Sequence, residues 1–180
     1  MKVDNKNRGK DYQLYIPYSK VKKKVKEIAN KINKQYKGKT PIFIGVLNGA
    51  FMFMADLLKE IKIDCEVDFY KLSSYGDDKI SSGQVKSLKE LNCEVHNRHI
   101  IIVEDIIDSG LSIQYIRNDI SKEKPKSLKV VALLFKNGVS KLDFKVDYVG
   151  FRIPNKFVVG YGLDYAQKYR NLKGIYVLKN

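Results

Sequence analysis

Four consecutive β-branched residues at positions 100–103, Ile-Ile-Ile-Val, constrain the fold of this 180-residue chain more than any other stretch. Such a run, with polar residues on either side, is typical of a strand buried on both faces of a parallel sheet. From Leu111 to Ile120 the apolar residues recur at helical spacing, so a helix is predicted to begin directly after Gly110. The segment in between therefore links the carboxyl end of a strand to the start of a helix.

The turn at residues 108–112 has the composition of an anion-binding loop. It contains a glycine that allows close backbone approach and two hydroxyl groups, and the following helix presents unpaired N–H groups at its N-terminus. In open parallel sheets, ligands bind beyond the carboxyl ends of the strands. The turn therefore predicts a phosphate site, although a solvated acidic turn that caps the next helix would have the same composition. The residues concerned are Asp108, Ser109, Gly110, Leu111 and Ser112.

Two adjacent carboxylates, Glu104 and Asp105, stand at the predicted end of the same strand. Such a pair repels itself unless a cation or a hydroxyl-rich group lies beside it. Magnesium is usually held in proteins by one or two carboxylates together with substrate oxygens. The pair therefore predicts a sugar diol or a hydrated Mg²⁺ ion as its partner.

Two motifs resemble those of one enzyme family. The apolar strand followed by Glu-Asp-Ile-Ile-Asp-Ser-Gly-Leu-Ser resembles the phosphoribosyl pyrophosphate (PRPP) signature of the type I phosphoribosyltransferases. Residues 157–165, Phe-Val-Val-Gly-Tyr-Gly-Leu-Asp-Tyr, with Arg170 close behind, are similar to the purine-binding end of the hypoxanthine-guanine phosphoribosyltransferases. The motifs stand in the family's order, and the resemblance extends from about Tyr15 to Leu178.

The resemblance implies an α/β fold with a mostly parallel sheet flanked by helices and a small hood subdomain. We expect a single domain over residues 1–180, with a core at about 19–136 and a hood at about 137–180 that includes some N-terminal residues. The alternation of predicted strands and helices agrees with such a sheet. The absence of GxGxxG and GxxxxGK[ST] motifs disfavours a dinucleotide fold and a P-loop nucleotidase.

The resemblance also implies purine salvage, in which PRPP and hypoxanthine or guanine give IMP or GMP and pyrophosphate. Asp108 is then the expected general base for the purine N7 proton. Glu104 and Asp105 are expected to hold the ribose hydroxyls, directly or through Mg²⁺. Asp164 is expected to contact the metal, and Arg170 to meet pyrophosphate. The PRPP-binding turn comprises Glu104, Asp105, Asp108, Ser109, Gly110, Leu111 and Ser112.

Asn48 and Gly49 follow a predicted buried strand at 41–47 and match the family's pyrophosphate loop. In the family this loop usually has a basic residue before the glycine and contains an unusual cis peptide. Asn48 takes the place of the basic residue, so the loop offers backbone groups but no side-chain charge. Residues 73–84, rich in Ser, Gly and Asp, resemble the flexible loop whose Ser-Tyr pair, here Ser74 and Tyr75, closes over the reacting centre and excludes water. A disordered segment would have the same composition.

Four residues match the purine-binding end of the family: Lys136, Phe157, Val158 and Asp164. Lys136, at the end of a predicted strand, is expected to donate to the exocyclic oxygen of a 6-oxopurine, which selects against adenine. Phe157 is expected to stack on the purine, and Val158 to offer backbone groups to its edge. From the residues alone, Lys136 could be a simple strand terminator and Phe157 an ordinary core residue.

Periodicity predicts the remaining elements. A helix is expected from the N-cap Ser19 to a stop at Gly38, with lysines on its solvent face. A strand is expected at 63–72, where apolar residues such as Val67 alternate with acids such as Asp68, as on a strand with one buried face. Further short elements are expected as a helix from Phe51 and as strands at 128–135, 147–151, 157–161 and 175–178.

Composition bounds the cellular setting and the partners. The two cysteines form no CxxC motif and no secretory leader precedes them, so we expect a cytoplasmic protein. No apolar run approaches membrane-spanning length. The net charge of +14 would suit nucleic acid, but residues 1–40 hold 13 basic and 3 acidic residues, without an aromatic or arginine platform for bases. A lysine-rich solvated helix face is the preferred interpretation.

Two alternatives stay open on the sequence. The first is a preference for xanthine, because the groups around the purine 2-position are not identified and the neighbouring Arg152 and Asn155 are divergent. The second is a regulator that has the PRPP-binding fold and binds RNA, which the basic N-terminal region suits but the intact purine-end motif with Lys136 does not. Family members form homodimers or homotetramers, and no sequence feature selects between them.

Overall fold

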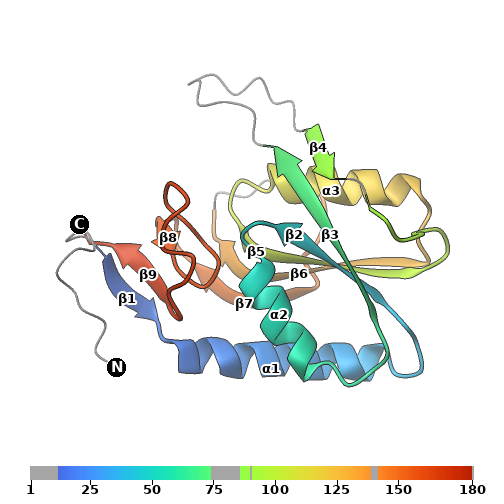
Figure 1. The fold of residues 1–180 in the computed structure, drawn as a ribbon, viewed down its shortest axis with the longest axis horizontal. Coiled ribbons are helices and arrows are strands. Elements are labelled where there is room, and N and C mark those ends of the chain that lie inside the picture. The colour runs from blue at the N-terminus through green and yellow to red at the C-terminus, as the bar shows by residue number, and fades with distance from the viewer. Residues whose placement is uncertain (1–11, 74–85, 90, 139–141, 180) are drawn as a thin grey trace.

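A six-stranded sheet forms the centre of the computed structural model, which describes residues 12–73, 86–89, 91–138 and 142–179 (Figure 1). Its strand order is β4-β3-β2-β5-β6-β7, and all neighbours are parallel except β3 and β4. The mostly parallel α/β sheet predicted from the sequence is therefore confirmed. The strands are β2 (Ile42–Leu47), β3 (Glu66–Ser73), β4 (Lys86–Lys89), β5 (His99–Ile107), β6 (Ser127–Lys136) and β7 (Tyr148–Ile153).

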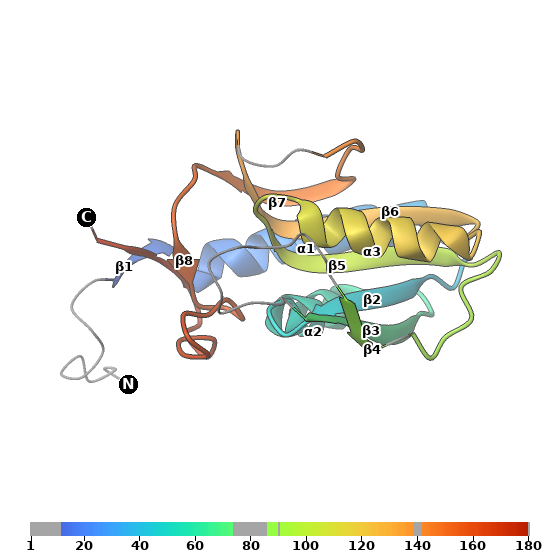
Figure 2. The same ribbon diagram turned by 90° about the horizontal axis from the view of Figure 1, so that it is seen from above.

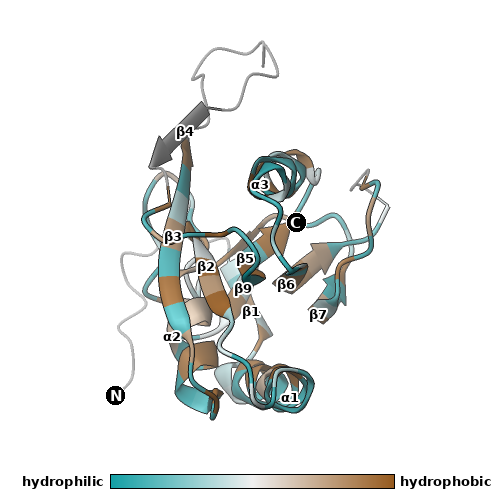
Figure 3. Cartoon of the chain, turned by 90° about the vertical axis from the view of Figure 1, so that its right-hand side faces the viewer, coloured by the Kyte–Doolittle hydropathy of each residue, from teal (hydrophilic) through white to brown (hydrophobic). Residues whose placement is uncertain are grey.

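Helices cover both faces of this sheet. Helices α1 (Tyr18–Gln35) and α2 (Phe51–Glu60) lie on one face, and α3 (Leu111–Lys122) lies on the other, as Figure 3 shows. Strand β5 packs against both layers: Ile101 and Val103 belong to the cluster under α1 and α2, and Ile100 and Ile102 to the cluster under α3. The β-branched run is thus buried on both faces, as predicted.

A second, three-stranded sheet stands beyond one end of the parallel strands (Figures 1 and 2). We call it the hood sheet; its order is β1-β9-β8, with antiparallel neighbours, and it joins the first described strand to the last. The core and hood boundaries expected from the sequence stay a prediction. Within the described residues, no helix combines the length and apolar character needed to cross a membrane. The hood strands are β1 (Tyr12–Ile16), β8 (Val158–Val159) and β9 (Ile175–Leu178).

The start of α1 corrects one prediction. The helix begins at Tyr18 with Pro17 as the N-cap, so Ser19 lies in the first turn and caps nothing with its side chain. Proline has its φ preset near the helical value and lacks the N–H that would stay unsatisfied at a helix start. The Pro17 carbonyl accepts the first backbone hydrogen bonds, from Lys20 and Val21.

Strand β3 corrects a second prediction. It begins at Glu66 rather than Ile63, and the predicted alternation fails at two neighbouring residues, since Val67 is 45% exposed and Asp68 only 6%. The Asp68 carboxylate accepts hydrogen bonds from the backbone N–H groups of Phe69, Asn92 and Cys93 at 2.7, 2.6 and 3.1 Å. A buried carboxylate is stable when it is hydrogen-bonded in this way, and a segment distant in sequence supplies two of the donors.

The C-terminal region contains less strand than predicted. The sequence predicts one strand over residues 157–161, but β8 contains only Val158 and Val159. The chain leaves the sheet because Gly160, Tyr161 and Gly162 all have positive φ, at 94°, 52° and 98°. Positive φ is incompatible with a regular strand, so the motif forms a turn instead.

Candidate active site

The carboxyl ends of β2, β5 and β6 meet at the edge of the sheet that faces the hood, and several predicted site residues gather there. Strand β5 extends to Ile107, so Glu104 and Asp105 are buried strand residues rather than parts of the following turn. The loop after β2 carries Asn48 and Gly49, and Lys136 is the last residue of β6. Parallel pairing of these strands therefore brings together residues that are about 90 positions apart in the sequence.

Gly49 lies directly against the carboxylate pair. A Cβ atom at this position would be 1.8 Å from Asp105 Oδ2, so only glycine lets the loop approach so closely. The peptide bond between Leu47 and Asn48 is cis, which agrees with the expectation for the pyrophosphate loop. The exposed Asn48 brings no charge, and the loop's contribution is therefore its backbone.

The carboxylate pair has an unusual electrostatic environment. Burial, and then the neighbouring Asp105 carboxylate, raise the pKa of Glu104 well above its usual value. Burial also raises the pKa of Asp105 to about 6, although the Ile106 N–H, at 2.8 Å from Oδ1, and the charge of Arg170 oppose the shift. Glu104 Oε2 is buried and has no hydrogen-bond partner among the described residues.

An unsatisfied buried carboxylate oxygen is costly, so this geometry calls for a ligand that supplies a cation or a hydroxyl donor. Among the described residues no group of three or more His, Cys, Asp or Glu side chains could hold a metal ion. A magnesium ion at the Glu104–Asp105 pair would therefore complete its shell with substrate and water oxygens, as Mg²⁺ commonly does.

Lys136 and Asp108 form an ion pair that the sequence did not predict. Lys136 Nζ lies 2.5 Å from Asp108 Oδ2, where the lysine side chain is 9% exposed and the aspartate 51% exposed. The lysine side chain is thus buried, and the carboxylate is half exposed to solvent. The expected purine-recognition residue and the expected base are adjacent.

The turn after β5 leads into α3 in the predicted way. Gly110 adopts a left-handed conformation, with φ of 89°, and is the N-cap of α3 without a side-chain cap. Ser109 and Ser112 are exposed, as is Leu111, whose N–H reaches Ser109 Oγ at 3.4 Å. The start of α3 has no side-chain cap and no acid in its first turn, so its first N–H groups favour the binding of an anion.

Asp164 and Arg170 come from the hood side and are paired with one another. Arg170 Nη2 lies 2.8 Å from Asp164 Oδ1, and Arg170 Nη1 donates to the Gly162 carbonyl at 2.8 Å. A Cβ atom at Gly162 would be 2.1 Å from the Gly49 carbonyl oxygen, so the hood touches the loop after β2. These contacts place both residues beside the carboxyl edge of the sheet.

The residues expected near the purine differ in how far they are exposed to solvent. Phe157 is 47% exposed and meets the Tyr165 ring edge-on at 5.7 Å, so it is not an ordinary core residue, whereas Val158 is buried in β8. The Arg152 guanidinium lies over the Phe135 ring, at 4.6 Å from its centroid. Ser74 and Tyr75, expected in the closing loop, lie outside the described residues.

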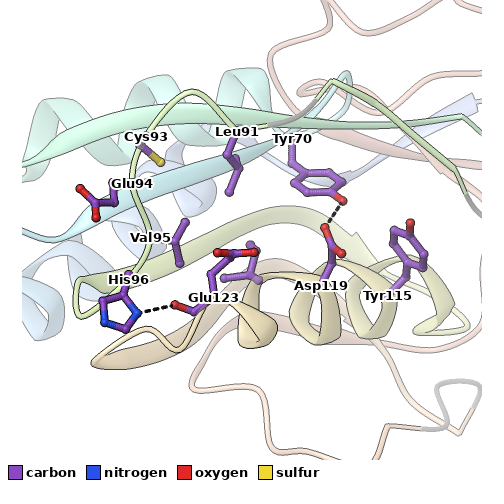
Figure 4. Close-up of a pocket in the computed structure, with 10 residues that line it drawn as sticks. Tyr70, Leu91, Cys93, Glu94, Val95, His96, Tyr115, Asp119 and Glu123 are labelled. Carbon is purple, nitrogen blue, oxygen red and sulfur yellow. Dashed lines mark hydrogen bonds between the residues drawn. The ribbon is translucent and has the colours of Figure 1, made fainter.

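A separate cleft of about 620 Å³ opens between β3, residues 91–96 and α3, and it contains none of the predicted site residues. Figure 4 shows Tyr70 donating to Asp119, at 2.8 Å, and the His96 ring beside the Glu123 carbonyl, at 3.2 Å. Both polar contacts are internal to the protein. Because none of its lining residues belongs to the predicted site, the cleft is separate from the site at the strand ends.

Comparisons with known proteins agree on one family. A family model described as the phosphoribosyl transferase domain matches residues 17–166. The hypoxanthine-guanine phosphoribosyltransferase of Bacillus subtilis (strain 168) is 49% identical over 167 residues, which cover 93% of each chain.

Solved structures give the same result. A crystal structure of a hypoxanthine-guanine phosphoribosyltransferase from Bacillus anthracis has a TM-score of 0.86 at 42% identity and covers 92% of this chain and 97% of its own. A hypoxanthine phosphoribosyltransferase from Staphylococcus aureus has a TM-score of 0.88 at 38% identity, with 93% and 91% covered. The likeness spans both the parallel sheet and the hood sheet.

Proposed function

This chain belongs to the phosphoribosyltransferase family, in its hypoxanthine-guanine branch, and from this membership we propose that it transfers the phosphoribosyl group of PRPP to hypoxanthine or guanine. The products are IMP or GMP and pyrophosphate, which makes the reaction a step of purine salvage. The bond between the anomeric carbon and the pyrophosphate oxygen breaks, and a bond from that carbon to a purine nitrogen forms. The carbon carries positive charge in the transition state, as in an oxocarbenium ion.

The observation that carries this proposal is the 2.5 Å contact between Lys136 and Asp108. Lysine is purely a hydrogen-bond donor, so it suits the oxygen at the 6-position of hypoxanthine and guanine and opposes the amino group of adenine. A lysine beside a candidate base supports purine recognition and proton removal at the same place.

Asp108 is proposed to accept the purine N7 proton. In the structure its carboxylate accepts a hydrogen bond from Lys136. A bound 6-oxopurine offers Lys136 a second acceptor and leaves carboxylate lone pairs for the N7–H group. Proton transfer then accompanies formation of the bond to the sugar, which is general base catalysis.

Glu104 and Asp105 are proposed to bind the ribose hydroxyls, since a hydroxyl donor would satisfy the buried Glu104 Oε2. The same pair would contact Mg²⁺ on the sheet side and Asp164 would contact it from the hood side, each together with substrate and water oxygens, because these three carboxylates do not form one ready-made metal site. When bound, the ion would neutralise the negative charge that develops on the leaving pyrophosphate. The two carboxyl groups also stabilise positive charge on the anomeric carbon.

The remaining PRPP groups are proposed to bind at the two strand-to-helix turns. The backbone around Gly49 and the Arg170 guanidinium would bind pyrophosphate, with Arg170 providing the side-chain charge that Asn48 lacks. The uncapped start of α3, at Gly110 and Ser112, would bind the 5′-phosphate. We also propose that Phe157 stacks on the purine and that Val158 offers backbone groups to its edge.

We further propose a cytoplasmic homo-oligomer, a dimer or a tetramer, that binds no nucleic acid. The free state of Cys65 and Cys93 supports a reducing compartment. The oligomer is proposed from the family membership. The lack of nucleic-acid binding is proposed because the basic N-terminal region has no aromatic or arginine platform for bases. Size-exclusion chromatography with light scattering measures the number of subunits.

The deciding experiment measures pyrophosphate release from PRPP and Mg²⁺ with hypoxanthine, guanine, xanthine and adenine in parallel. Release with hypoxanthine and guanine, but not with adenine, is the expected result and tests the Lys136 assignment at the same time. The xanthine reaction tests the alternative specificity. No release with any purine, from protein that still binds PRPP, would contradict the proposal.

A further inference from the structure

A tight turn at residues 160–162, which we call the wedged turn, joins the hood to the loop after β2. We define that loop, residues 48–50, as the pyrophosphate loop. Gly160, Tyr161 and Gly162 all lie in the left-handed region, and a non-glycine residue there is held only by surrounding structure. A Cβ atom at Gly160 would be 2.3 Å from the Gly174 carbonyl oxygen, and one at Gly162 would be 2.1 Å from that of Gly49. The turn therefore fits tightly between two stretches of backbone.

The side chain of Tyr161 provides a second connection on the same side. It is fully buried, and its hydroxyl donates a hydrogen bond to Asp56 Oδ2 at 2.9 Å. Burial and the Asp56 carboxylate raise the pKa of Tyr161, so its hydroxyl keeps the proton that it donates. Asp56 lies on α2, the helix that begins directly after the pyrophosphate loop. One side-chain hydrogen bond thus links the turn to that helix.

The turn also holds the two hood residues assigned to PRPP. The Gly162 N–H donates to the Arg170 carbonyl at 3.0 Å, and the Arg170 guanidinium donates back to the Gly162 carbonyl at 2.8 Å. The same guanidinium pairs with Asp164. A shift of the turn would therefore move Arg170 and Asp164 together, relative to Gly49.

We propose that Tyr161 and Asp56 are positioning residues, whose hydrogen bond fixes Arg170 against the pyrophosphate loop before PRPP binds. The inference rests on the proposed function, because it assigns pyrophosphate to the space between Arg170 and Gly49. Neither Tyr161 nor Asp56 touches the substrate in this arrangement. Their effect is on affinity for the pyrophosphate group, and the chemical step is left unchanged.

Tyr18 provides a matched control within the same cluster. Its hydroxyl donates to the same oxygen, Asp56 Oδ2, at 3.2 Å, but it belongs to α1. Its ring lies beside the Tyr161 ring, with 6.1 Å between the two centroids, and Y18F keeps that ring contact. Asp56 also pairs with Lys59 at 3.1 Å, so its charge stays neutralised when either tyrosine hydroxyl is removed. A purely structural role for this cluster predicts equal effects of Y161F and Y18F.

The experiment compares wild type, Y161F, Y18F and D56N by calorimetric binding of inorganic pyrophosphate with Mg²⁺, and by steady-state kinetics. We expect Y161F and D56N to weaken pyrophosphate binding and raise the KM for PRPP by about tenfold, the factor that one hydrogen bond to a charged group provides. The kcat and the KM for hypoxanthine should stay within about twofold, and Y18F should match wild type. The double variant Y161F/D56N should bind pyrophosphate no worse than D56N alone, because D56N already changes the acceptor of the Tyr161 hydroxyl, along with the contacts of Asp56 with Tyr18 and Lys59.

Equal pyrophosphate affinities of Y161F and Y18F would overturn the proposal, as would wild-type protein that binds no pyrophosphate. A fall in kcat with an unchanged KM for PRPP would overturn it too. The proposed transfer reaction is tested separately by wild-type turnover with hypoxanthine. Pyrophosphate binding and turnover can therefore fail independently of one another.

Discussion

Replacing Glu104 with glutamine tests whether the carboxylate pair is kept at a cost to stability. Burial and the neighbouring Asp105 raise the pKa of Glu104 well above its usual 4.5, so the folded protein keeps a proton that the unfolded chain releases. The contribution of Glu104 to the free energy of unfolding is fully present below pH 4.5, and it is lost as the pH rises from there through the raised pKa. One retained proton lowers the free energy of unfolding by about 1.4 kcal/mol per pH unit in that window.

Glutamine has nearly the same shape, is uncharged and can donate to Asp105, so E104Q lacks this slope. We expect the free energy of unfolding of E104Q, relative to that of wild type, to be about 1.4 kcal/mol higher at pH 6 than at pH 5. Asp105, whose pKa is raised to about 6, loses its own contribution in both proteins. The same substitution should weaken PRPP binding, because a carboxylate proposed to bind ribose and Mg²⁺ is lost.

The assay is urea denaturation of both proteins at pH 5, 6 and 7 in buffer without Mg²⁺. The exposed Glu94 provides the control, and E94Q should follow the wild-type pH dependence. Parallel curves for E104Q and wild type would refute the reasoning, because they would mean that Glu104 is ionised in the folded protein as it is in the unfolded chain.

Three further substitutions test the site. D108N should lower kcat by about 10²- to 10⁴-fold with little change in the KM for PRPP, and unchanged turnover in the pyrophosphate-release assay would exclude Asp108 as the base. K136Q should lower kcat/KM for hypoxanthine by about 10- to 100-fold, the value of a hydrogen bond from a charged donor, and an equal loss of PRPP affinity would contradict a purine-specific role. G49A places a Cβ 1.8 Å from Asp105 Oδ2, so its KM for PRPP should rise by at least about tenfold, and a wild-type KM would show that the loop has room.

Several features could be predicted because they depend on neighbouring residues. The β-branched run at 100–103, the helix after Gly110 and the helix from Phe51 all appear where periodicity places them. The motif at residues 104–112 likewise indicates the family through its residue types and their order alone. Strand period and turn chemistry are local properties, so a single sequence contains them.

Other features could not be predicted because their partners are distant in the chain. Asp68 is buried because backbone groups of Asn92 and Cys93 reach its carboxylate. The apolar–acidic alternation of β3 contains no trace of those donors. Burial of a polar group depends on tertiary partners, and here it placed an acid in the interior where the alternation predicted a side chain facing solvent.

The candidate site shows the same division. Local patterns indicated Glu104 and Asp108 as site residues, and the resemblance to the family added Lys136. They did not show that Lys136 pairs with Asp108, or that the carboxylate pair lies against Gly49. These contacts exist because parallel strands far apart in the sequence end at the same edge of one sheet, and only the packed sheet brings those ends together.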